Sequence, residues 1–113
     1  MVARELKTGS LAGLDRAAAE VLASSPAIAA DLATRALELT PPGDPELIHR
    51  SLAAAESLTA AGRLTEAIKL TGSTLALPLP TSTCARLRCA LSSALRMCGQ
   101  ATEALVEIDR VLA

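Results

Sequence analysis

The sequence predicts an all-α protein: a short α-solenoid of about six helices, paired into about three antiparallel hairpins. Ala and Leu fill 44 of the 113 positions, and both are strong helix formers without a β-branch. No stretch alternates polar and apolar residues in the way a half-buried strand does. A short sequence motif, here called the phrase, also occurs twice: "AAGRLTEAIKL" at 60–70 is similar to "MCGQATEALVEI" at 97–108.

The two copies of this phrase lie 37 positions apart, and they align Gly62 with Gly99 and Ala67 with Ala104. A helical hairpin that recurs at a period of roughly 30–45 residues is the sequence signature of an α-solenoid. We therefore interpret the phrase as the inner turn of a repeated hairpin. The glycines would end its first helix, and the alanines would lie where its two helices approach most closely.

Residues 1–9 are predicted to form an N-terminal tail, followed by a single repeat domain over 10–113, whose first hairpin spans about 10–40. Ser10 is the expected N-cap of the first helix. Ser25 is the expected N-cap of the second, with Pro26 at its first position, where a missing N–H costs nothing. The predicted apolar stripes are Leu11, Leu14, Ala18 and Leu22, then Ile28, Leu32, Ala36 and Leu39.

The second hairpin is predicted over about 44–77. Asp44 is its expected N-cap, followed by Pro45, and Gly62 ends its first helix in the manner of a C-cap. The apolar positions are Ile48, Leu52, Ala55 and Leu58, then Leu64, Ala67, Ile68 and Leu75. Pro78 and Pro80 then break the helix.

The third hairpin is predicted over about 81–112, beginning at Thr81 or Ser82. Its apolar positions are Leu87, Leu91, Ala94 and Leu95, then Ala104, Leu105, Ile108, Val111 and Leu112. Linkers of about two to five residues make successive helices antiparallel neighbours. Only part of the last stripe can be covered by the preceding helix. We therefore expect a protein or peptide partner, or self-association through this C-terminal hairpin.

Charge and composition argue against several classes of function. The net charge is −1 and no aromatic residue is present, so we expect no direct nucleic-acid binding. No apolar run approaches the roughly 18 residues of a membrane span, and the N-terminus lacks a signal peptide, so a cytoplasmic location is expected. Cys84, Cys89 and Cys98 point in different directions on one helix, which predicts buried reduced thiols rather than a metal site.

No residue pattern indicates catalysis. His49 is the only histidine, with nothing in the sequence to orient it, and is expected at or near the surface. We predict no enzyme activity, no cofactor and no metal. Arg86, Arg88 and Arg96 make their helix mildly basic, while the last helix is acidic. Attraction between these neighbouring helices is the favoured explanation, and a groove for an acidic peptide is the alternative.

The hairpins resemble tetratricopeptide repeats, whose pattern is W-x2-L-G-x2-Y followed by a small Ala. With that Ala placed on Ala67, the family's Gly falls on Ala55, its Tyr on Leu58 and its Trp on Ser51. The small residues match and the aromatic residues are missing, so the hairpins are TPR-like. The period of 37 also exceeds the usual value of about 34.

A longer stretch, "SPAIAADLATRALELTPPGDPELIHRSLAAAESLTAAGRLTEA" at 25–67, resembles the middle region of large ATP-binding LuxR-type transcriptional regulators of actinobacteria. This resemblance implies a helical sensor or coupling segment between an ATPase and a DNA-binding domain. Because the chain contains neither flanking domain, we expect a fragment, a remnant or a free-standing copy of that segment. The expected function is a non-catalytic interaction module. The alternatives are a small-ligand-sensing helical domain and an independent protein–protein adaptor.

Overall fold

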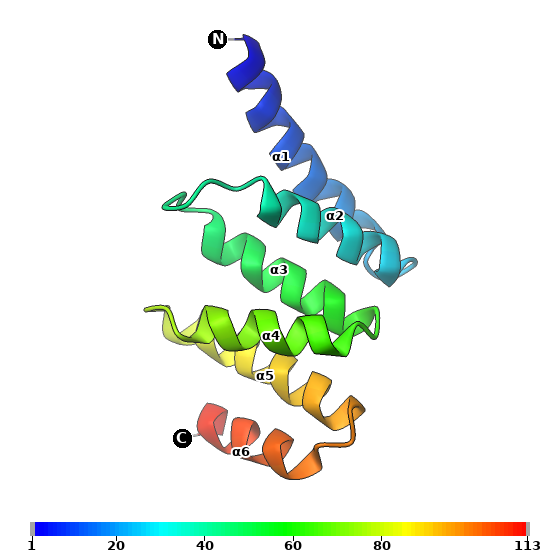
Figure 1. Ribbon diagram of the computed structural model, residues 1–113, viewed down its shortest axis with the longest axis vertical. Helices are drawn as coiled ribbons and strands as arrows, with labels where there is room; N and C mark the ends of the chain where they lie inside the picture. Colours follow the sequence, from blue (N-terminus) through cyan, green and yellow to red (C-terminus); the bar gives the residue numbers. More distant parts are fainter. Residues whose placement is uncertain (1, 113) are drawn as a thin grey trace.

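The computed structural model describes residues 2–112, with the side chains of 11–100 and 102–112. Within this range the chain forms six α-helices and no strand (Figure 1). The helices are α1 (Val2–Val21), α2 (Pro26–Glu38), α3 (Leu47–Ala60), α4 (Leu64–Leu75), α5 (Thr81–Met97) and α6 (Ala101–Leu112).

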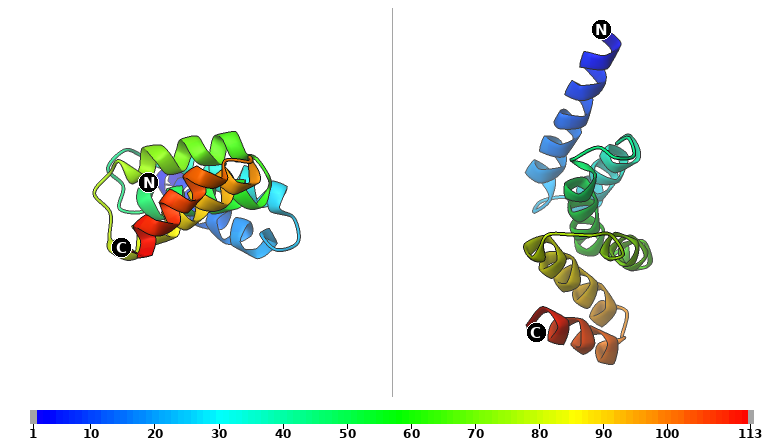
Figure 2. Two further views of the ribbon diagram at one scale, coloured as in Figure 1. Left: turned by 90° about the horizontal axis from the view of Figure 1, so that it is seen from below. Right: turned by 90° about the vertical axis from the view of Figure 1, so that its left-hand side faces the viewer.

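Each helix packs antiparallel against the next, and the six are stacked along the long axis of a molecule that measures 50 × 31 × 18 Å (Figures 1 and 2). In addition, α3 packs against α5, so the first helices of the second and third hairpins are neighbours. The predicted all-α stack of paired helices is therefore confirmed.

The turns at Gly62 and Gly99 have the same geometry. Gly62 has a φ of 76° and Gly99 a φ of 83°, a conformation that side chains disfavour. After Gly62, the Arg63 N–H donates to the Leu58 carbonyl at 2.9 Å, and after Gly99 the Gln100 N–H donates to Leu95 at 2.8 Å. Both turns are Schellman motifs, so the repeated phrase corresponds to a repeated structure.

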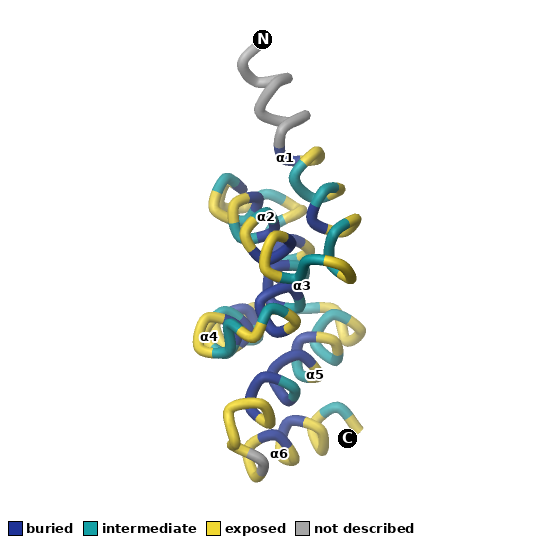
Figure 3. Tube along the Cα trace, turned by 90° about the vertical axis from the view of Figure 1, so that its right-hand side faces the viewer, coloured by how far each residue is buried: buried dark blue, intermediate teal, exposed yellow. Residues whose placement is uncertain are grey.

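Small residues recur in the core at the same 37-residue step. On the first helix of each hairpin they are Ala18, Ala55 and Ser92, and on the second helix Ala30, Ala67 and Ala104. All six are buried. The buried residues follow the middle of the stack, where neighbouring helices meet (Figure 3). A chain without large aromatic side chains fills its core by bringing helices close together at these small positions.

Two predicted helix starts and one predicted side-chain cap need correction. Helix α1 begins at Val2 rather than at Ser10, because no proline precedes Ser10 to turn the chain out of the helical conformation. Helix α3 begins at Leu47, and Asp44 instead accepts a hydrogen bond from the Glu46 N–H at 2.8 Å within the preceding turn. Ser25 precedes α2 as expected, but its hydroxyl makes no capping hydrogen bond.

Two predictions of burial were also wrong. Ile28 was placed on the apolar stripe of α2, but it is exposed, and the helix buries Ala29, Ala30, Ala33 and Ala36 instead. The three cysteines are free thiols, yet Cys84 is only half-buried, and Cys89 and Cys98 are exposed. On α5 the leucines occupy the buried face, which leaves the thiols outside it.

Candidate interaction surfaces

A hollow of about 190 Å³ lies between α1 and α3. Its walls are mainly small and apolar, with Ala18 and Ala19 from α1, Leu22 from the turn after it and Ala53 from α3. His49 and Glu56 of α3 stand at its polar edge, together with the pair formed by Asp15 and Arg50. The prediction that His49 lies at the surface is confirmed, since its side chain is exposed.

A second, more open hollow of about 450 Å³ lies between α3 and α5. It is lined by Thr59 and Ala60 on α3 and by Ala85, Cys89, Ala90 and Ser93 on α5. Glu56 and Arg86 also line it, and Glu56 is shared with the first hollow. The two hollows adjoin at Glu56, and the surface that they make up together, here called the first-helix groove, includes the first helix of all three hairpins.

The charges of the first-helix groove are paired with one another. The Arg50 guanidinium is almost buried and donates through Nε to both Asp15 oxygens, at 3.2 and 3.0 Å, and through Nη1 to the Thr40 hydroxyl at 3.2 Å. Arg86 donates to Glu56 at 2.8 Å. Because each arginine faces a carboxylate, the groove has little net charge and does not select a strongly acidic or basic ligand.

The three arginines predicted as a weak partner-binding set do not come together. Arg86 faces α3 across the groove, whereas Arg88 donates to Glu107 of α6 at 2.9 Å. The hydrogen bond to Glu107 raises the pKa of Arg88. Arg96 is exposed in the last turn of α5. The Arg88–Glu107 pair is the attraction between neighbouring helices that the sequence favoured.

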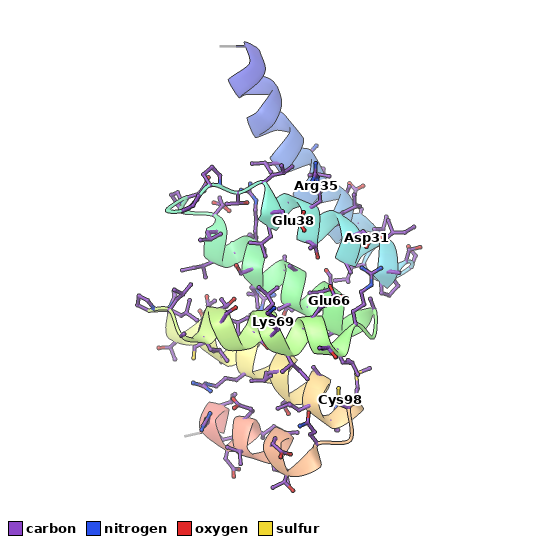
Figure 4. All side chains as sticks on the ribbon, in the orientation of Figure 1. Asp31, Arg35, Glu38, Glu66, Lys69 and Cys98 are labelled. Carbon is purple, nitrogen blue, oxygen red and sulfur yellow. The ribbon has the colours of Figure 1, made fainter. Side chains whose placement is uncertain are left out.

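The opposite side of the stack is charged. Asp31, Arg35 and Glu38 on α2 and Glu66 and Lys69 on α4 project from the helices that lie in front of α1 and α5 (Figure 4). Asp31 accepts a hydrogen bond from Arg63 at 2.6 Å, an interaction that raises the pKa of Arg63. This side is a solvated surface, in contrast to the small and apolar floor of the first-helix groove.

The last helix has an inverted pattern of burial. Glu107 is only 8% exposed, because it accepts hydrogen bonds from Arg88 and Arg110. By contrast, Leu105 is 62% exposed and Leu112 is 79% exposed, and Ile108 is also exposed. Helix α6 thus turns a carboxylate inward and an apolar stripe outward.

Two further features are absent from the described residues. No three His, Cys, Asp or Glu side chains within them gather as a metal-binding group. None of the described helices has the length and apolar character needed to cross a membrane. Comparison with family models, curated proteins and solved structures gives no match to this chain.

Proposed function

We propose that this chain is a non-catalytic interaction module that holds a peptide or protein segment in the first-helix groove. The observation that carries the proposal is the groove itself, which runs over all three hairpins on an apolar floor with internally paired charges. Stacks of helical hairpins provide extended concave surfaces of this kind. The resemblance at 25–67 further suggests a sensor or coupling segment of a LuxR-type regulator, and the neighbouring reading frames would test that link.

The small size of one hollow and the openness of the other favour a segment of protein over a small metabolite. Pockets for small ligands usually enclose about 300–1,000 Å³ and bury most of the ligand. The hollow beneath α1 is about 190 Å³. The larger one is open to solvent. The alternative function, a small-ligand sensor, would be supported if small apolar compounds raised the melting temperature of the protein.

The proposal can be tested by selecting peptides from a random display library on the folded protein. The affinity of the selected peptides would then be measured by fluorescence anisotropy for two matched variants. Ala60 and Ala76 are both exposed alanines at the C-terminal end of a helix, but only Ala60 lines the groove. We expect Ala60→Arg to weaken binding by about tenfold or more and Ala76→Arg to leave it unchanged. Equal binding by both variants would contradict the proposal.

A further inference from the structure

We propose that the exposed stripe of α6, Leu105, Ile108 and Leu112, is the docking site for a basic amphipathic helix with leucines four residues apart. The inference rests on the proposed function as an interaction module. It concerns a second surface, separate from the first-helix groove, so the two can be tested independently.

The stripe is continuous along one face of the helix. Its three members are spaced by three and four residues, which places them on the same side of an α-helix. Most of the side chains of Leu105 and Leu112 are in contact with water. A contiguous apolar surface of this kind marks an interaction site more often than single exposed leucines do.

The 37-residue repeat shows what covers such a stripe elsewhere in the molecule. The equivalent positions on α4 are Ile68, Thr71 and Leu75. Ile68 and Leu75 pack against the cluster of Leu91, Leu95 and Ala104, and Leu75 also packs beside Leu87. Helix α5 therefore packs on the stripe of α4. Helix α6 carries the same stripe one repeat later, and there all three side chains are exposed.

Helix α5, which covers the stripe of α4, indicates the chemistry of a helix that fits the stripe of α6. Helix α5 presents Leu87, Leu91 and Leu95 at four-residue steps. Two of its arginines, next to this row in the sequence, pair with carboxylates of α3 and α6 rather than of α4. The edge of α6 beside the stripe carries one exposed carboxylate, Asp109, directly after Ile108, whereas Arg110 donates a hydrogen bond to Glu107. A basic helix complements this edge. A second copy that docked its own α6 here would bring another Asp109 towards the same edge, and like charges oppose that arrangement.

The test uses a fluorescein-labelled peptide with the sequence of residues 79–100, in which Cys84→Ser, Cys89→Ser and Cys98→Ser remove the thiols. It is titrated with the 113-residue protein to about 500 µM, because a short helix pays for its own ordering. We expect saturable binding that Leu105→Asp and Leu112→Asp each weaken by about tenfold or more. Asp109→Arg should weaken it severalfold. Leu91→Asp in the peptide should abolish it.

Matched controls distinguish docking on the stripe from binding elsewhere on the protein and from replacement of α5 by the peptide. Val106 is an exposed apolar residue of α6 that lies off the stripe, so Val106→Asp should leave the affinity within about twofold. Binding that survives Leu105→Asp would mean that the peptide replaces α5 within the fold, and it would overturn the inference. The same holds for the absence of binding over the whole titration.

Sedimentation of the protein distinguishes the remaining occupant. One outcome is that the wild-type protein self-associates, in an association that Leu105→Asp removes and with which the peptide does not compete. This outcome would assign the stripe to a second copy and overturn the choice of a basic helix. The Ala60→Arg variant should bind the α5 peptide normally. If peptide docking fails while groove ligands remain sensitive to Ala60→Arg, only the inference about α6 falls.

Discussion

The hydroxyl of Ser92 on α5 donates a hydrogen bond to the backbone carbonyl of Ala104 on α6 at 3.2 Å. A side chain as short as serine can reach the opposite backbone only where the two helices lie very close together. Both residues are buried, and both belong to the series of small residues that recurs every 37 positions. The contact marks a close approach of the two helices within the third hairpin.

A larger side chain at this contact should destabilise the protein. We expect Ala104→Leu to lower the free energy of unfolding by roughly 1–3 kcal/mol, because the added atoms have no space between α5 and α6. Ala76→Leu, at an exposed position after α4, should change it by less than about 0.5 kcal/mol. Urea denaturation followed by circular dichroism gives both values. Similar losses for the two variants would mean that Ala104 is not a close contact.

The two Schellman turns should respond alike to substitution. Gly62→Ala and Gly99→Ala place a Cβ on a backbone with positive φ, so each should cost about 1–2 kcal/mol in the free energy of unfolding. Gly72 lies inside α4, and outside the backbone of its own helix and its two chain neighbours no atom is within 4 Å of a new Cβ. Gly72→Ala should therefore stabilise the protein by about 0.5–1 kcal/mol. Thermal denaturation of the three variants tests whether the two turn variants lose stability while Gly72→Ala gains it.

The Asp15–Arg50 ion pair beneath α1 should contribute more to the stability of the protein than the Asp31–Arg63 ion pair on the charged side. Asp15→Ala leaves the nearly buried guanidinium of Arg50 without its carboxylate, and we expect a loss of roughly 1–3 kcal/mol in the free energy of unfolding. Asp31→Ala removes the partner of Arg63 in a solvated setting, so the melting temperature should hardly change. The ranking should persist in 1 M NaCl, where surface pairs are screened. An equal effect of the two variants would contradict it.

The purified chain should neither hydrolyse ATP nor retard duplex DNA in a gel at moderate salt. The sequence contains no phosphate-binding loop, and the structure shows Arg86 and Arg88 held by carboxylates of neighbouring helices. The measurements are phosphate release and electrophoretic mobility at micromolar protein. DNA binding that weakens steeply with salt would show that the arginines are available to phosphates after all.

Local signals in the sequence were sufficient to predict the six helices and the repeat. Proline at position 26 and glycine at positions 62 and 99 act on their own backbone, through a fixed φ, a missing N–H or access to positive φ. Such effects do not depend on the rest of the fold. For this reason the ends of α2, α4 and α5 lie within a few residues of their predicted places, and the turn of the second hairpin matches that of the third.

Contacts between distant residues were decided only by the tertiary structure. The packing of α2 against α1 and α3 selects a face of alanines and leaves Ile28 in water, although periodicity alone favours the larger side chain. The burial of Glu107 depends on Arg88 from the neighbouring helix, and the exposure of Leu105 depends on which face of α6 packs against α5. The first-helix groove likewise joins residues from three hairpins. None of these relationships follows from the pattern within one helix, because the energy of burial is set by what packs on each face.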